Sequence, residues 1–131
     1  MRSLGTGEVG QQDPVGWVTT DAAGHVYTDE GQSVVKYDAD GSCLADFDLA
    51  ALVTAPLGIA VDPKGDIYVA SETSSDNNAL PESLIELDAK GKLLHDWPAT
   101  GETLALDPGG KAIYIAFFTW ASLRKYALPT G

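Results

Sequence analysis

The feature that most constrains the fold of this chain is an internal repeat. Three segments share an Asp, a Gly three residues later and a Tyr soon after it, and the tyrosines are 41 and 46 positions apart. The segments are 21–28, 62–69 and 107–115, and the third is one residue longer. Self-similarity with a period of 20–50 residues is typical of stacked supersecondary units, so the sequence predicts an array of such units.

A second motif follows each segment and also ends in a turn signal. It covers 33–41 and 83–91, and a third version covers 122–131. Asp and Gly both favour turns, because an Asp side chain accepts backbone N–H groups and Gly adopts a positive φ at low cost. We therefore predict hairpin turns at the Asp-x-x-Gly blocks 21–24, 38–41, 62–65, 88–91 and 107–110, and a sixth turn at 128–131.

The stretches between these turns predict short antiparallel strands. The expected strands are 15–20, 25–28, 33–37, 43–47, 57–61, 66–70, 83–87, 92–97, 102–106, 112–117 and 121–126. Several are apolar on both faces, as in 57–61 and 112–116, which indicates a sheet that is covered on both sides. We expect one helical turn, at 48–53, with Asp48 as its cap.

Four-stranded antiparallel units that repeat every 40–50 residues and bury both faces describe the blades of a β-propeller. The fold class is therefore predicted to be all-β, with about three propeller blades of four-stranded antiparallel sheets. The alternative is a β-sandwich of eleven short strands. The shared register of turn, Tyr and Ser in the three repeats favours the propeller.

The segment 56–70 resembles the core of an NHL repeat, and 5–17 resembles the glycine-rich approach to such a repeat with its Pro-x-Gly motif. The resemblance covers nearly the whole chain and is strongest in the second repeat. The first repeat is one residue longer between Gly16 and Asp21, and the third carries Thr100-Gly101-Glu102 in place of Pro-x-Gly. The resemblance implies a six-bladed propeller of the NHL and gluconolactonase-like kind, a group that includes interaction and sensor domains, lactonases and lyases.

The repeats divide the chain into 14–55, 56–101 and 102–131, with 1–13 completing a neighbouring blade, so 1–131 is expected to be a single partial β-propeller. Three blades do not close a ring, because propellers typically have about four to eight. Either the chain is a fragment of a longer propeller, which we favour, or two copies form a homodimeric six-bladed ring.

The charge of the chain bears on its partners. There are 8 Lys and Arg residues against 19 Asp and Glu, giving a net charge of −11. Nucleic acid and anionic membranes are attracted by clustered basic residues, so neither is an expected partner. Apolar runs also fall short of the roughly 20 residues that a membrane helix needs. The residues indicate no particular cellular compartment.

The resemblance implies a site at one end of a central channel, in the loops that follow the second strand of each blade. These loops are 29–32, 71–82 and 117–120. The candidates for a binding site in them are Asp29, Glu30, Ser71, Glu72, Phe118 and Trp120. The alternative for the aromatic residues, including Trp17 and Phe117, is that they fill the core between blades.

The middle loop is longer than its counterparts and rich in oxygen-bearing side chains. The gluconolactonase-like enzymes hold a divalent metal with acidic and Asn side chains, so the resemblance makes Glu72, Asn77 and Asn78 candidate ligands for calcium or another divalent ion. The competing interpretation is a solvated polar loop.

Other chemistry-bearing residues are expected to be structural. Ser33, Ser83 and Ser122 recur at equivalent positions, whereas a nucleophile needs one unique site. Cys43 aligns with Leu93 and is predicted to be a small core residue. His25 is expected to be exposed, and His95 is expected in an outer strand away from any channel.

The leading hypothesis is a non-enzymatic binding or scaffold module whose partner is a protein, a peptide or a small-molecule ligand. The alternative is part of a divalent-metal-dependent hydrolase or lyase of the gluconolactonase-like class. A third is a purely structural set of blades within a larger surface protein.

Overall fold

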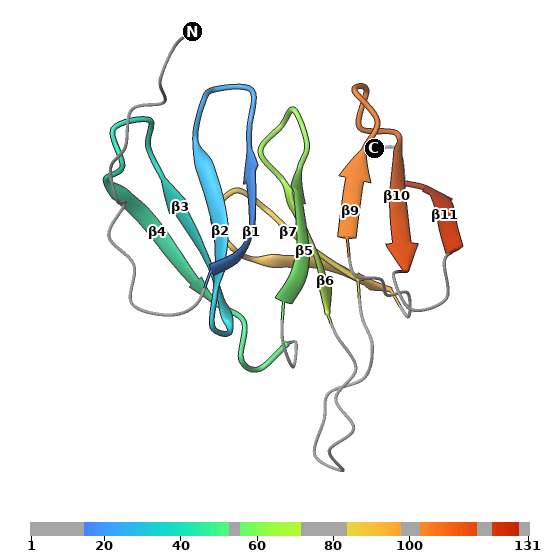
Figure 1. Cartoon of the computed structure of the whole chain (residues 1–131), viewed down its shortest axis with the longest axis horizontal. Helices are drawn as coiled ribbons and strands as arrows, with labels where there is room; N and C mark the ends of the chain where they lie inside the picture. The colour runs from blue at the N-terminus through green and yellow to red at the C-terminus, as the bar shows by residue number, and fades with distance from the viewer. Residues whose placement is uncertain (1–14, 53–55, 72–83, 98–102, 118–121, 129–131) are drawn as a thin grey trace, which may run out of the picture.

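The structure is a computed structural model, and it describes residues 15–52, 56–71, 84–97, 103–117 and 122–128. These residues form an all-β structure without a helix (Figure 1). No helix in them is long and apolar enough to cross a membrane. The strands are β1 (Val15–Thr20), β2 (Val26–Glu30), β3 (Ser33–Tyr37), β4 (Cys43–Asp48), β5 (Pro56–Val61), β6 (Ile67–Ser71), β7 (Leu84–Leu87), β8 (Leu93–Trp97), β9 (Thr103–Leu106), β10 (Ala112–Phe117) and β11 (Ser122–Ala127).

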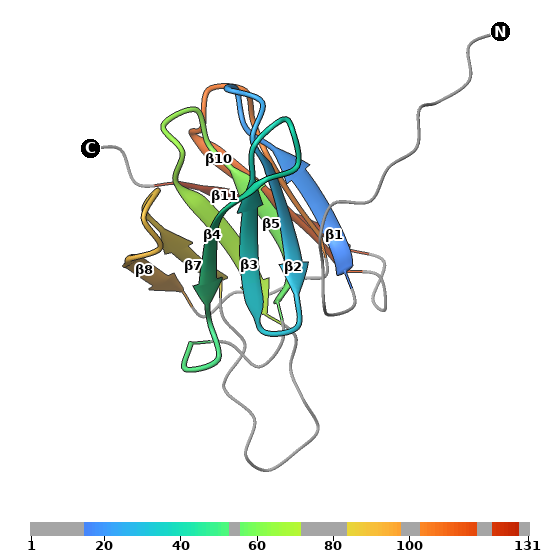
Figure 2. The ribbon, with the colours of Figure 1, turned by 90° about the vertical axis from the view of Figure 1, so that its left-hand side faces the viewer.

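The strands form three antiparallel sheets, each a meander of consecutive strands. The first sheet has the order β1-β2-β3-β4, the second β5-β6-β7-β8, and the third β9-β10-β11. Figure 2 shows the first sheet with its strands in this order. The predicted strands are confirmed to within two residues at each end. This accuracy follows from the turn residues, which fix where each short strand stops.

The five predicted Asp-x-x-Gly turns are confirmed. In the turn of β5 and β6, Oδ1 of Asp62 accepts the backbone N–H groups of Lys64 and Asp66 at 2.9 and 3.0 Å. The N–H of Gly65 donates to the Asp62 carbonyl at 2.9 Å, and Gly65 has a φ of 94°. The additional residue of the third repeat shifts this pattern by one, so that Asp107 accepts from Lys111 and Ala112 instead.

The second sheet is packed between the other two. Its residues alternate between the faces, as strand geometry requires. Ile59, Ile67, Val69, Ile85 and Leu87 pack toward the first sheet against Tyr27, Val34 and Leu49. Ala60, Tyr68 and Leu84 pack toward the third sheet against Ile113 and Ile115. The first strands of the sheets, β1, β5 and β9, lie in sequence beside one another. The prediction that β5 is apolar on both faces therefore has a packing explanation.

Two local predictions were wrong. Residues 50–52, just after β4, form a turn in which the N–H of Leu52 donates to the Leu49 carbonyl at 2.9 Å, and not a helical turn, although Oδ1 of Asp48 does accept the N–H of Ala50 at 3.0 Å. The N–H of Leu49 donates to the carbonyl of Gln32, between β2 and β3, at 2.9 Å, and the Leu49 side chain is buried, so these contacts also hold the turn in place. Cys43 is exposed and not a core residue, because β4 is an edge strand whose residues are largely open to solvent.

Candidate functional site

Of the residues predicted to form a binding site, the structure describes the side chains of two. Asp29 and Glu30 are the last residues of β2, where they are buried, and not residues of a loop. Ser71 ends β6, but its side chain lies outside the described residues, as do Glu72, Asn77, Asn78, Phe118 and Trp120. The structure thus places two of the six predicted residues, and their assembly with the other four into one site stays a prediction.

The carboxylates of Asp29 and Glu30 are both engaged in the sheet. Oδ1 of Asp29 accepts the backbone N–H of Trp17. Oε2 of Glu30 accepts the hydroxyls of Thr28 and Tyr37, each at 2.6 Å. Burial, together with the hydrogen bond to Glu30, raises the pKa of Tyr37 to about 12. These contacts hold β2 against β1 and β3.

The repeated tyrosines identify a second set of candidate positions. Tyr27, Tyr68 and Tyr114 lie on the second strand of their sheets, and each pairs across to a charged residue on the third strand: Lys36, Glu86 and Lys125 in turn. Because Tyr27 packs toward the second sheet and Tyr68 toward the third, each marks a boundary between sheets. We call the first the basic notch (Asp21, His25, Tyr27, Lys36 and Lys64) and the second the acidic notch (Asp62, Asp66, Tyr68, Glu86 and His95).

The basic notch is organised by the carboxylate of Asp21. Its Oδ2 accepts from His25 Nδ1 at 2.8 Å and from the Tyr27 hydroxyl at 2.9 Å. Its Oδ1 accepts the backbone N–H groups of Ala23 and His25, both at 2.9 Å. Burial opposes ionisation of Asp21, but these hydrogen bonds outweigh it and lower the pKa to about 2. Lys36 places its Nζ 5.7 Å from the centre of the Tyr27 ring, a cation–π contact.

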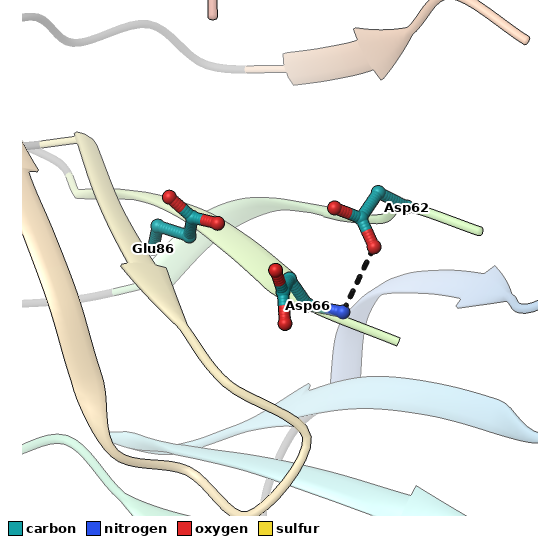
Figure 3. Close-up of side chains that lie close together, drawn as sticks. All are labelled: Asp62, Asp66 and Glu86. Atoms are coloured by element: carbon teal, nitrogen blue, oxygen red, sulfur yellow. Dashed lines mark hydrogen bonds between the residues drawn. The ribbon is translucent and has the colours of Figure 1, made fainter. Parts of the chain in front are cut away.

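The acidic notch brings three carboxyl groups together, as Figure 3 shows. One oxygen from each of Asp62, Asp66 and Glu86 lies within 4.8 Å of the others. Glu86 is 6% exposed, and it accepts the Tyr68 hydroxyl at 3.1 Å and contacts His95 Nδ1 at 2.7 Å. The His95 ring stacks on Trp97 with its centre 5.1 Å away.

Proximity of these carboxyl groups favours a shared proton. Burial raises the pKa of Asp66, and the hydrogen bond to Glu86 raises it further, against the opposing charge of Lys64, whose Nζ lies 3.6 Å from the Asp66 carboxylate. A hydrogen bond between two carboxyl groups needs one proton, since carboxylates are acceptors only. Hard oxygen atoms at this spacing could also hold a divalent cation, which would compete with that proton.

Two depressions lie at the turn ends of the sheets. One, of about 390 Å³, lies at the basic notch, lined by His25, Tyr27 and Lys36 from the first sheet and by Pro63, Lys64 and Ala89 from the second. The other, of about 200 Å³, lies where the turns of Asp21, Asp62 and Asp107 meet. The turn aspartates thus border a space shared by the three sheets.

Sequence reasoning assigned no function to the notches. It treated Asp62 as a turn residue, placed Asp66 at the start of the strand 66–70, and placed His95 in an outer strand away from any channel. The signal was present in the repeat itself, since Glu86 occupies the position of Lys36 and Lys125, and Asp66 that of His25. Only the structure shows that Asp66 and Glu86 lie close together.

No family model matches the chain, and no curated protein matches it. Solved structures do. A chain in the complex of KlAtg21 with the coiled-coil of AgAtg16 is 17% identical, with a TM-score of 0.63 over 88% of this chain and 38% of that one. A chain of Kuenenia stuttgartiensis hydrazine synthase is 20% identical, with a TM-score of 0.62 over 88% of this chain and 33% of that one. The chain therefore spans about a third of the length of these structures and is similar to them in fold.

Proposed function

We propose that the three sheets are successive blades of a β-propeller of the NHL-repeat kind. The observation that carries this proposal is the packing of the second sheet, which is covered on both faces by sheets of the same repeat. The order of β1, β5 and β9 beside one another also fits inner strands arranged around an axis. A sandwich predicts two facing sheets, whereas here three follow one another in chain order.

Blades of such an array need neighbours on both sides. The third sheet exposes 70% of Leu123, and the first exposes 66% of Val18. Repeat units bury their faces against adjacent units, so we propose that further blades, from a longer chain or a second copy, cover these positions.

Mass measurement in solution tests this part of the proposal. We expect the chain to associate through its open faces, and we expect Leu123→Glu to shift it toward the monomer, because a buried charge opposes such packing. Ala23→Glu, on an exposed turn, is the matched control. A wild-type chain that is a stable monomer, unaffected by Leu123→Glu, would argue against open blade faces.

We further propose that the module acts by binding a protein or peptide partner. The net charge of −11 supports a partner with a surplus of basic residues, since electrostatic complementarity speeds association and selects partners. Selection of a displayed peptide library on the immobilised protein tests this proposal. We expect a recurring sequence with Lys or Arg that binds in solution with an affinity that falls as salt rises. Selection that yields no recurring sequence would contradict it.

The metal-dependent hydrolase or lyase makes a different prediction, and thermal melting in calcium and in chelator distinguishes the two. Filling a metal site stabilises the folded state by mass action. Stabilisation that is lost in Glu72→Ala and Asn77→Ala would favour the loop ligands and the enzyme. Stabilisation lost only in Glu86→Gln would place the ion in the acidic notch. An unchanged melting temperature in millimolar calcium favours the binding module.

A further inference from the structure

We propose that the depression at the basic notch binds a small oxyanion, the carboxylate or phosphate group of a small molecule. Its volume of about 390 Å³ lies in the range of ligand pockets, which run from roughly 300 to 1,000 Å³. Both sheets contribute to its walls, so a ligand there would contact the turns of β1–β2 and β5–β6 together.

The charge of the lining is unusual for this chain. His25, Lys36 and Lys64 all line the depression, in a protein with more than twice as many acidic residues as Lys and Arg residues. Lys36 is half-buried, and within the described residues it makes a cation–π contact with the Tyr27 ring and no ion pair. An ammonium group without a carboxylate partner is available for a charge-assisted hydrogen bond to an anionic ligand.

The one acid at the depression is already engaged. Asp21 accepts four hydrogen bonds, from the His25 ring, the Tyr27 hydroxyl and two backbone N–H groups. Because the Asp21 carboxylate accepts from Nδ1–H, the orientation of the imidazole is fixed, and Nε2 of the neutral ring is an acceptor that donates only when the ring carries a second proton. Lys36 from one sheet and Lys64 from the other thus supply ammonium donors around one space, and the Lys64 Nζ also lies 3.6 Å from the Asp66 carboxylate. Pro63 and Ala89 supply apolar wall.

The chain contains two internal comparisons for this proposal. At the equivalent position of the acidic notch, Asp66 and Glu86 replace His25 and Lys36, so the same frame there repels an oxyanion. In the third sheet, Lys125 lies 5.7 Å from the Tyr114 ring centre, the same arrangement as Lys36 and Tyr27, but no described sheet faces it. Lys125 is therefore a matched control for Lys36.

Amide chemical shifts measured during titration with inorganic phosphate and, separately, acetate test the proposal, with ionic strength held constant by sodium chloride. We expect saturable shifts at Ala23, His25 and Gly65 with at least one probe, and the tighter probe identifies the preferred oxyanion. Lys36→Met should weaken binding about tenfold or more, the effect of removing one charged hydrogen bond. Lys125→Met should leave it unchanged.

Shifts that grow linearly without saturation, or equal affinity in the wild type and in Lys36→Met, would overturn the proposal. Equal weakening by Lys125→Met would also overturn it, because a general loss of positive charge would then explain the effect. Should Lys36→Met fail to fold, Lys64→Met keeps the test, since the Lys64 side chain is 74% exposed and its loss leaves the core intact.

Discussion

The two boundaries between neighbouring sheets use one frame and carry opposite charge. Each has a turn aspartate on the first strand side and a tyrosine on the second strand that packs toward the next sheet. Around that frame, the basic notch places His25 and Lys36 where the acidic notch places Asp66 and Glu86. The turn aspartate and the tyrosine pack the sheets together and occur at both boundaries. The residues around the tyrosine differ between the boundaries, and the fold is the same.

We expect the largest loss of stability from replacing the tyrosine between two sheets. Tyr68→Ala should destabilise the protein by about 3–5 kcal/mol, as for other large buried aromatic residues, because Tyr68 is 4% exposed between two sheets. Tyr114→Ala, at the same repeat position on the half-buried face of the third sheet, should cost about 1 kcal/mol. Urea denaturation measures both. Equal losses would mean that the third sheet is covered as fully as the second.

Substitutions at Glu86 test whether the acidic notch tolerates the charge of the basic notch. Glu86→Ala should cost about 2 kcal/mol, because it leaves the buried Tyr68 hydroxyl without its acceptor. Glu86→Lys removes the same acceptor, but it restores the Tyr–Lys pairing of the other two sheets and supplies a counter-charge to Asp66, so we expect it to cost less than Glu86→Ala. Urea denaturation of the two variants at pH 7 checks this order. A larger loss for Glu86→Lys would show that the notches are not interchangeable.

The lysines over the tyrosine rings should give the smallest effect. Lys36→Met and Lys125→Met each remove a cation–π contact, worth about 0.5–1 kcal/mol at exposed or half-exposed sites. The loss should be slightly larger for Lys36, because it is half-buried and Lys125 is exposed. Thermal melting of both variants at two salt concentrations measures it. A loss above 2 kcal/mol for Lys125 would imply a contact beyond the described residues.

The turns and strands could be predicted because their signals are local. Asp and Gly at fixed offsets determine each hairpin, and Gly65 and its counterparts do adopt positive φ values. Cys43 could not be placed by alignment with Leu93, since the exposure of an edge strand depends on what lies beyond it. The sequence alone does not reveal the acidic notch, because Glu86 is separated in sequence from Asp62 and Asp66 and reaches them only through the pairing of β7 with β6. Considered alone, each of these residues is an ordinary polar residue of a turn or a strand.

The positions of Asp29 and Glu30 in the predicted binding site also depend on strand pairing. Asp29 and Glu30 are expected in the loop 29–32 between the predicted strands 25–28 and 33–37, yet β2 continues through both residues. The hydroxyls of Thr28 and Tyr37 donate to the buried Glu30 carboxylate, and these hydrogen bonds offset its preference for solvent. These hydrogen bonds come from residues on the paired strands, which cannot be identified by considering Glu30 alone.

The opposite charge of the notches is tested most directly by the pH dependence of the free energy of unfolding for the wild type, Asp21→Asn and Asp66→Asn. The pKa of Asp21 is lowered to about 2, so its stabilisation, about 2 kcal/mol, is present above about pH 4 and is lost as the pH falls toward 2. The pKa of Asp66 is raised, so its stabilisation is present at low pH and is lost as the pH rises through its folded-state value. The advantage of the wild type over Asp21→Asn should therefore grow with pH, while its advantage over Asp66→Asn should shrink. Parallel curves for the two variants would contradict this account.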